Sequence, residues 1–480
     1  MYRKIRDVLR SRWSAEGGYR EFIVIAAPLI LSTGSWSLQH FIDRMFLTWY
    51  SPAAIAAAMP AGMLNFMILT LFLGTVTYVD TFVAQYYGAG QRKRIGPVLW
   101  QGLYLSLLGG ILIAGAAPWA HTIFSAVHHP PEVMENEVIF FRTLCYGSFF
   151  PLGAAVMAGF YAGRGRTWTV MWVNCVSMGV NIVLDYLLIF GNGGFPRWGI
   201  FGAGVATVAA GATAFFLYLA CIIFEKNRSQ YAFGSWRISQ TLLWRLLKFG
   251  FPNGVQFFID IAGFTAFIMI MGALGTTALA ASSIAFNINA LIFMPMIGSG
   301  IAASILVGQY LGRKRPDIAE KSAYTAFHIS FAYMFFVSAL FVCFPSVFIA
   351  PFAAKSSFTA FVDMQHTITV LLRFIAVYSL FDAMNIIFAS AIKGAGDTHF
   401  VMKTIGVCSV GILIVPMYLA ITVFHAGMYA AWTLGTAYTI VIGIVFLLRF
   451  RAGQWKKMLV IEHPPAVITP LPEACSKNIC

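Results

Sequence analysis

Charged residues are scarce in this chain of 480 residues. They make up 10% of it, whereas 59% of the residues are hydrophobic. Soluble globular proteins carry about 25% charged residues, so this composition excludes a soluble protein and indicates an integral membrane protein. Cysteine is also scarce, and the seven cysteines show no spacing typical of a zinc site or a disulfide framework. The basic, polar first 20 residues and the long apolar run after them predict no cleavable signal peptide.

Long apolar runs fill the rest of the sequence. A helical membrane span needs roughly 20 apolar residues, and the runs are continuously apolar rather than alternating, which favours helices over a barrel. The sequence therefore predicts an all-α integral membrane protein. Its twelve predicted spans cover residues 22–48, 54–82, 98–122, 138–161, 168–190, 200–224, 246–274, 278–308, 323–351, 367–392, 401–424 and 427–449.

The basic residues gather on one side of the predicted membrane. Of the 32 Lys and Arg residues, 27 lie in the N-terminal segment, in the loops after the even-numbered spans and in the C-terminal tail. The positive-inside rule then places both termini in the cytoplasm of a multi-pass plasma (inner) membrane protein. The net charge of +14 thus reflects topology, and we expect no nucleic-acid partner.

The chain contains two copies of a six-span unit. A shift of 224 residues aligns spans 1 and 2 with spans 7 and 8, and a shift of 231 residues aligns span 4 with span 10. Because six is an even number, both copies enter the membrane in the same orientation, as two lobes related by a pseudo-two-fold axis along the membrane normal. The matched positions include Val83, Gln85, Tyr86 and Gly88 on Val307, Gln309, Tyr310 and Gly312, and Gly163 and Gly165 on Gly394 and Gly396.

The repeat defines five segments. These are a cytoplasmic N-terminal segment (1–21), an N-lobe (22–225), a cytoplasmic interlobe linker (226–245), a C-lobe (246–450) and a cytoplasmic tail (451–480). Trp236, Leu242, Leu243 and Leu246 predict a short amphipathic helix on the membrane surface around the linker. The tail is rich in proline and polar groups, so we expect it to be loose.

Several motifs resemble the multidrug and toxic compound extrusion (MATE) family. They are Phe41-Ile-Asp-Arg, Val83-Ala-Gln-Tyr-Tyr-Gly-Ala-Gly, Asn181-Ile-Val-Leu-Asp185, Gly250-Phe-Pro252 with Phe258-Ile-Asp260, and Phe381-Asp-Ala followed by Lys393-Gly-Ala-Gly. The resemblance runs from about residue 20 to residue 450 and keeps the spacing as well as the residue types. It implies a secondary antiporter that exports organic, often cationic and amphipathic, compounds by alternating access between two six-helix lobes.

Four aspartates lie inside predicted spans, where a carboxylate is expensive unless it faces a cavity or a partner. Asp43 and the Asn181/Asp185 pair resemble the N-lobe cation site of the DinF-like branch. Asp260 and Asp382 resemble the C-lobe sodium site of the NorM-like branch. An apolar site favours the neutral form of a carboxyl group and suits H⁺, whereas carboxylate, amide and carbonyl oxygens suit Na⁺. Both coupling ions therefore stay open, and we expect no other cofactor or metal.

Some charged positions also have a plain structural interpretation. Each of the four acids can serve to hold helices together, and Arg44 strengthens that interpretation for Asp43, since the family has a small hydroxyl residue there. Arg44 can pair with Asp43, reach outward to the membrane surface or meet an acid on another helix. We interpret Asp80 as a charge at the end of span 2, and His128 and His129 as part of an exposed acidic loop rather than a metal site.

The partners we expect are small organic substrates and the lipid bilayer, with the protein as a monomer. Trp36, Phe264, Phe267 and Met384 are the predicted lining of a promiscuous substrate cavity. A lipid or oligosaccharide flippase of the same superfamily is the alternative transporter, although those proteins line the cavity with basic groups. Gly394-Ala-Gly-Asp397 matches the motif of intramembrane aspartyl proteases, but we place it in a loop. We therefore expect no enzyme and no catalytic residue.

Overall fold

The structure is a computed structural model and describes residues 12–226, 228–353 and 358–462. Within these residues it has eleven helices long and apolar enough to cross a membrane. A twelfth span is the pair α7 (Pro131–Gly147) and α8 (Phe149–Gly163), which is bent by 41°. The predicted all-α fold with twelve spans is confirmed. Residues 1–11 of the predicted N-terminal segment and 463–480 of the predicted tail lie outside the described residues.

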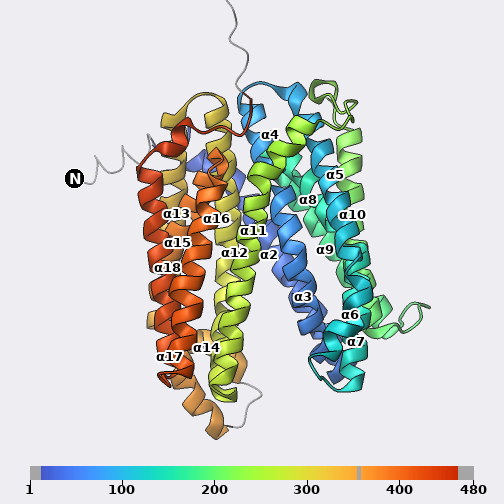
Figure 1. The fold of residues 1–480 in the computed structure, drawn as a ribbon, viewed down its shortest axis with the longest axis vertical. Helices are drawn as coiled ribbons and strands as arrows, with labels where there is room; N and C mark the ends of the chain where they lie inside the picture. Colours follow the sequence, from blue (N-terminus) through green and yellow to red (C-terminus); the bar gives the residue numbers. More distant parts are fainter. Residues whose placement is uncertain (1–11, 227, 354–357, 463–480) are drawn as a thin grey trace, which may run out of the picture.

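The helices form two lobes that lie side by side (Figure 1). The N-lobe contains α2 (Tyr19–Tyr50), α3 (Pro52–Thr77), α4 (Val79–Gly88), α5 (Ile95–Ala114), α6 (Ala120–Ser125), α7, α8, α9 (Thr167–Phe190) and α10 (Gly199–Ile223). The C-lobe contains α11 (Gln240–Ala273), α12 (Thr276–Gly312), α13 (Pro316–Cys343), α14 (Pro345–Ala353), α15 (Phe358–Ala395), α16 (Thr398–Cys408), α17 (Val415–Thr422) and α18 (Met428–Arg451). A π-helical turn, Ser409–Ile414, joins α16 to α17.

Local sequence explains where several helices begin and end. Ser51 precedes α3, and its side chain accepts a hydrogen bond from the backbone N–H of Ala53, with Pro52 in the first turn. Ser239 caps α11 in the same way. Gly191 ends α9 in the left-handed conformation at φ 74°, which glycine adopts without strain. These residues set the span boundaries that hydropathy alone leaves imprecise.

The linker differs from the prediction of a separate amphipathic helix. The described part contains only a short 3₁₀ turn, Arg228–Tyr231, before α11 begins at Gln240. Leu242 and Leu246 belong to the first turns of α11 and are buried there. The apolar periodicity therefore belongs to the first turns of the long helix α11 rather than to a helix of its own.

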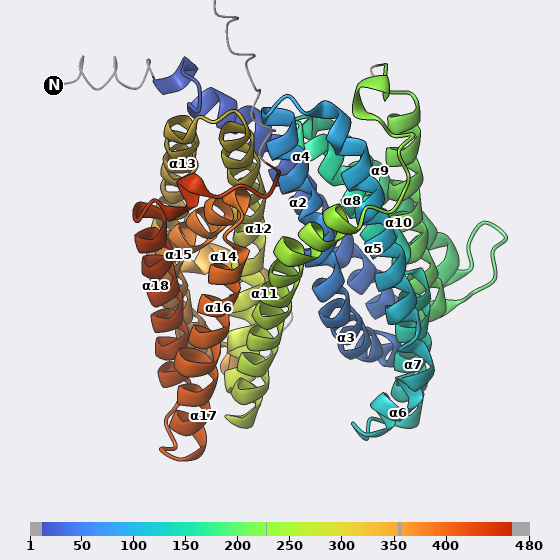
Figure 2. The same ribbon diagram turned by 45° about the horizontal axis from the view of Figure 1, so that its top comes forward.

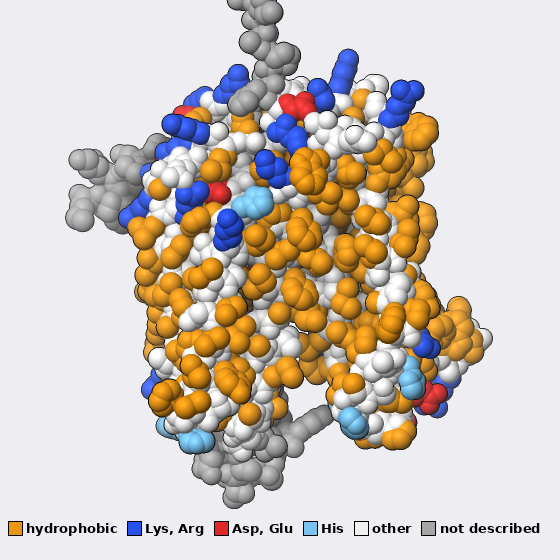
Figure 3. All heavy atoms as spheres, viewed as in Figure 1, with side chains coloured by type: hydrophobic (Ala, Val, Ile, Leu, Met, Phe, Trp, Pro, Cys, Tyr) orange, Lys and Arg blue, Asp and Glu red, His pale blue; other side chains and the backbone are white. Residues whose placement is uncertain are grey.

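The lobes meet along two pairs of helices. Helix α2 packs against α12 and α3 packs against α11, while the short α4 also reaches α12 (Figure 2). We call the end of the molecule where α4 and α12 finish the basic end, because Lys and Arg side chains gather there (Figure 3). At the opposite end the space-filling view shows the lobes separated by a gap.

Equivalent residues of the two repeat copies make equivalent contacts that close the basic end. The backbones of α4 and α12 approach so closely that a Cβ on Gly88 would lie 2.0 Å from the carbonyl oxygen of Gln309. A Cβ on Gly312 would lie 2.2 Å from that of Gln85. Only glycine fits at such a crossing. The repeated glycines of the Val-x-Gln-Tyr-x-Gly motif are therefore explained by contact between the lobes.

The C-terminal segment also crosses this end, and part of the predicted loose tail is in fact packed. Trp455 is buried and stacks on Phe450, and Val460 and Ile461 are buried. The backbone N–H of Val460 donates to Oε1 of Gln85 at 2.9 Å, and Arg245 donates to the carbonyl of Val460 at 2.6 and 3.0 Å. We call residues Gln454–Glu462 the C-terminal strap. It joins the N-lobe helix α4 to the C-lobe helix α11.

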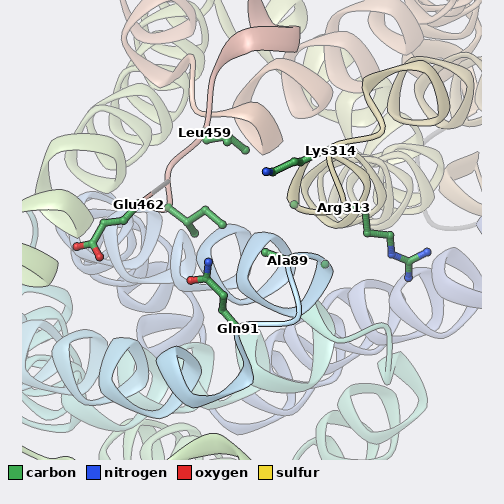
Figure 4. A pocket seen from close by; sticks show the side chains of 9 residues that line it. Ala89, Gln91, Arg313, Lys314, Leu459 and Glu462 are labelled. Carbon is green, nitrogen blue, oxygen red and sulfur yellow. The ribbon is translucent and has the colours of Figure 1, made fainter. Parts of the chain in front are cut away.

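Beside the strap lies a surface pocket of about 520 Å³ (Figure 4). Figure 4 shows Lys314 pointing into it, while the guanidinium group of Arg313 points away. The ends of α4 and α12 and the strap form its walls, so the pocket belongs to the closed basic end. The residues that line it are Gly88, Ala89, Gln91, Gly312, Arg313, Lys314, Leu459, Ile461 and Glu462.

Candidate functional site

The three predicted N-lobe residues come together between α2 and α9. The carboxyl groups of Asp43 on α2 and Asp185 on α9 interact with each other, and Asn181 lies one turn before Asp185 on α9. Asn181 and Asp185 are fully buried, and the side chain of Asp43 is 14% exposed. Two interacting carboxyl groups in such surroundings cannot both carry a charge without strong repulsion. The pair therefore suits a shared proton or a bound cation.

Five polar side-chain atoms of this cluster have no hydrogen-bond partner in the described part of the chain. Both carboxyl oxygens of Asp185, both polar side-chain atoms of Asn181 and Oδ1 of Asp43 are buried without a hydrogen-bond partner. Leaving a buried polar group unsatisfied costs about 1–3 kcal/mol. Carboxylate and amide oxygens are also the ligands that small hard cations prefer. The cluster therefore has the composition of a cation site. A purely structural role would leave the free-energy cost of its unpaired polar groups uncompensated.

Two basic side chains on α2 flank Asp43. His40 Nδ1 lies 3.9 Å from Oδ2 of Asp43, and the His40 ring makes an edge contact with Trp36. Arg44 is exposed and forms no ion pair with any residue that the structure describes. It acts on Asp43 and His40 through electrostatics alone. Of the three orientations that the sequence left open for Arg44, the outward one is found.

The two C-lobe acids lie on different helices and interact electrostatically. Oδ2 of Asp260 on α11 accepts a hydrogen bond from Nε2 of Gln256 at 2.6 Å. Asp382 on α15 is buried, and its Oδ1 accepts from Nδ2 of Asn385 at 3.1 Å. Unlike the N-lobe acids, each of these has an amide donor. The two clusters are therefore chemically different. The repeat agrees with this, since a shift of 224 residues places Asp43 on Phe267 and Asp260 on Trp36.

Sequence reasoning missed the amide partners and one lysine. Gln256 precedes Asp260 by four positions and Asn385 follows Asp382 by three, so each pair shares a helix face. That spacing could have identified both amides. Nζ of Lys393 donates to Oε1 of Gln256 at 3.0 Å. The predicted spans place Lys393 in the loop after span 10, yet it lies in the last turn of α15, where its ammonium group binds Gln256 and interacts electrostatically with Asp260.

The predicted cavity residues lie in different surroundings. Trp36 is 40% exposed and contacts Phe66, which in turn meets Phe257 of the other lobe. Phe264 is exposed and Met384 is partly buried. Phe267 is 5% exposed and packs against aromatic rings inside the C-lobe, which is a core position. A role of these four residues in substrate binding stays a prediction.

The outer loop contains an ion pair. His129 Nδ1 lies 2.8 Å from Oε1 of the buried Glu137. No group of three or more potential metal ligands occurs among the residues that the structure describes. Asp397 of the protease-like motif pairs with Arg449 at 2.8 Å and directly precedes α16. Both observations give these residues structural partners.

A family model decides the classification. The model described as MatE matches residues 28–187 and 252–419, one segment in each lobe. The chain belongs to the MATE family. The two matched segments begin at Pro28 and Pro252, which are equivalent positions in the repeat. They include all five residues of the two acid clusters. Members of this family are transporters, and this chain is a multi-pass membrane transporter.

Individual relatives of the MATE family agree with this assignment. A probable multidrug resistance protein NorM from Bradyrhizobium diazoefficiens is 28% identical over 443 residues, which cover 90% of this chain and 92% of the relative. The multidrug resistance protein NorM of Burkholderia vietnamiensis is 28% identical over 85% of this chain and 87% of its own. The assignment to particular DinF-like or NorM-like branches stays a prediction.

Solved structures share the fold. A multidrug resistance MATE family transporter of the MOP superfamily, in an outward-facing conformation, superposes with a TM-score of 0.83 at 20% identity. That match covers 93% of this chain and 98% of the other. The eukaryotic MATE transporter AtDTX14 gives a TM-score of 0.81 at 18% identity, over 91% and 96% of the two chains. The fold is thus that of MATE transporters.

Proposed function

We propose that the protein is a multidrug exporter that exchanges amphipathic, often cationic, organic compounds for H⁺ or Na⁺. The observation that carries the proposal is the Asp43–Asn181–Asp185 cluster. It places two buried carboxyl groups together with an amide that has no partner among the described residues. Such a cluster binds one cation readily and repels a second. The names of the bacterial relatives support the export of drugs.

The arrangement of the lobes supports alternating access. With the basic end facing the cytoplasm, as the positive-inside rule requires, the closed end is cytoplasmic and the separated end faces outward. The protein in this form takes up its coupling cation from outside and releases its organic substrate there. Both termini are then cytoplasmic, the membrane is the inner membrane, and one chain holds all the acids of both clusters.

The membrane potential contributes to this exchange when more positive charge enters than leaves. Each net elementary charge that moves inward through 100 mV supplies about 2.3 kcal/mol, whereas a tenfold concentration ratio of the exported compound requires about 1.4 kcal/mol. An exchange of one organic cation for one H⁺ or Na⁺ moves no net charge and is driven by the ion gradient alone. Proteoliposomes that contain the protein and a fluorescent organic cation test the proposal. Efflux should accelerate when an inward H⁺ or Na⁺ gradient is imposed, and Asp185→Asn should abolish that acceleration. If the variant responds to the gradient like the parent protein, the N-lobe assignment fails.

A further inference from the structure

Lys393 is a cation placed beside the C-lobe acids by the fold itself. It lies in the last turn of α15 and is partly buried between the lobes. A lysine in the last helical turn has a plain role, because its charge offsets the helix dipole. That role does not require the ammonium group to face an acid on another helix. The contacts of Lys393 therefore indicate something more.

A hydrogen-bonded chain connects Lys393 to Asp260. Nζ of Lys393 donates to Oε1 of Gln256 at 3.0 Å, and Nε2 of Gln256 donates to Oδ2 of Asp260 at 2.6 Å. The amide accepts from a cation and donates to an anion, so its dipole is aligned with both charges. The positive charge of Lys393 thereby acts on Asp260 through a single side chain.

An acid of the other lobe attracts the same lysine. Asp80, in the first turn of α4, interacts electrostatically with Lys393, as Asp260 does. Asp80 is partly buried in the first turn of α4, so the interpretation of it as a helix-end charge stands beside this interaction. Tyr78 holds the two lobes in register here, since its hydroxyl donates to the carbonyl oxygen of Lys393 at 2.6 Å. Lys393 is thus attracted through space by an N-lobe and a C-lobe carboxylate while the basic end is closed.

We propose that Lys393 is a built-in competitor of the coupling cation at Asp260, and that closure of the basic end controls it through Asp80. This inference rests on the proposed antiport function and adds a residue to its machinery. With the basic end closed, Asp80 also attracts the ammonium group of Lys393. The lysine then competes less strongly at Asp260, and Asp260 accepts a cation from outside. When the basic end opens, α4 moves away with Asp80. The ammonium group then acts on Asp260 alone and expels the bound cation inward.

Na⁺ binding to the purified protein tests the inference without any transport. Ligands that bind only the folded state raise its stability by RT ln(1 + L/Kd), where L is the free ligand concentration, so a tighter site gives the same stabilisation at a lower ligand concentration. The unfolding temperature is therefore followed against NaCl, with choline chloride keeping the ionic strength constant. Asp185→Asn serves as the background for all variants, so that Na⁺ at the N-lobe cluster does not contribute.

Two substitutions should shift Na⁺ binding in opposite directions. Lys393→Met removes the competing charge, and the NaCl concentration that raises the unfolding temperature by a fixed amount above its value without NaCl should fall about tenfold. Asp80→Asn removes the N-lobe attraction and leaves the lysine on Asp260, so this concentration should rise. Lys393→Arg should bind Na⁺ like the background protein. Lys403→Met, at an exposed position on α16 of the same lobe, is the matched control and should change nothing.

The inference is overturned when Lys393→Met binds Na⁺ no more tightly than the background protein. It is equally overturned when Asp80→Asn leaves Na⁺ binding unchanged or tightens it. If Lys393 had only a structural role, Lys393→Met would unfold at a lower temperature, and the dependence of that temperature on NaCl would stay unchanged. If Lys393→Met does not fold, the direction seen for Asp80→Asn decides alone. Failure of the antiport proposal would appear separately, as wild-type proteoliposomes that do not respond to any cation gradient.

Discussion

Gln85 and Gln309 join the two lobes through the same hydrogen bond made twice. Nε2 of Gln85 donates to the carbonyl oxygen of Gly394 at 2.9 Å, and Nε2 of Gln309 donates to that of Gly163 at 2.8 Å. These carbonyls lie in the last turns of α15 and α8, where helical carbonyls have no partner within the helix. In the sequence repeat Gln85 is equivalent to Gln309, and Gly163 is equivalent to Gly394. The duplication thus built a symmetric latch at the basic end.

Gln309→Leu should weaken this latch. It leaves the carbonyl of Gly163 buried and unpaired, which costs about 1–3 kcal/mol and lowers the population of the closed form. Spin labels at Lys93 and Asp317, two exposed positions on different lobes, would report the distance across the basic end. We expect a longer component to appear in the variant. Gln230→Leu in the exposed linker is the control, and identical distance distributions in all three proteins would contradict the latch.

Asp43→Asn and Asp185→Asn should each lower gradient-driven efflux by at least about tenfold. Either change keeps the shape of the cluster and removes the charge that attracts a cation. The rates would be measured in proteoliposomes at equal protein content. Asp317→Asn, on an exposed surface next to Arg315, is the matched control. Unchanged efflux in Asp185→Asn would show that the N-lobe acids only hold helices together.

Asp260→Asn and Asp382→Asn should also reduce efflux, because we assign the C-lobe cluster to coupling as well. Their measurement separates the two lobes when H⁺ and Na⁺ gradients are imposed in turn. A variant that loses the response to one ion and keeps the response to the other would assign that ion to the C-lobe. Full activity of both variants under both gradients would restrict coupling to the N-lobe.

The periodicity and the repeat were sufficient to predict the twelve spans and the two lobes, since apolar length and duplication are properties of the sequence itself. The grouping of Asp43 with Asn181 and Asp185 came instead from the resemblance to the MATE family. The sequence could not predict contacts between helices that are far apart along the chain. Nothing local indicates that Lys393 turns toward Gln256, or that Gln85 finds Gly394 in the other lobe. The strap was missed because the proline-rich, polar residues after it dominate the composition of the predicted tail, and the apolar run Met458–Ile461 is too short to predict a helix or a span.

Arg245→Ala should release the C-terminal strap. The change removes two hydrogen bonds to the carbonyl of Val460 and the longer contact with Glu462 at 3.9 Å. Loss of the bonds from this charged donor costs about 1.5–3 kcal/mol. Limited proteolysis within Gln454–Glu462 should accelerate by about tenfold or more. Arg451→Ala, exposed at the end of α18, controls for the loss of charge, and equal cleavage rates in the two variants would contradict the packing role.

Phe267→Ala and Trp36→Ala should have opposite effects. Phe267 packs inside an aromatic cluster with Phe286 and Trp432, and truncating a buried phenylalanine costs about 3–5 kcal/mol. Its variant should unfold at a lower temperature and keep the substrate range of the parent. Trp36 is exposed beside His40, so its variant should stay stable and change the relative efflux rates of different dyes. A reversal of the two phenotypes would place Phe267, and not Trp36, in the substrate cavity.

The most direct test of the central claim is efflux of a fluorescent organic cation from proteoliposomes, measured separately under an inward H⁺ gradient and an inward Na⁺ gradient. Wild-type protein should export the dye faster under at least one of them, and Asp185→Asn should export it at the rate without a gradient. Equal rates with and without both gradients in the wild-type protein would contradict cation-coupled export.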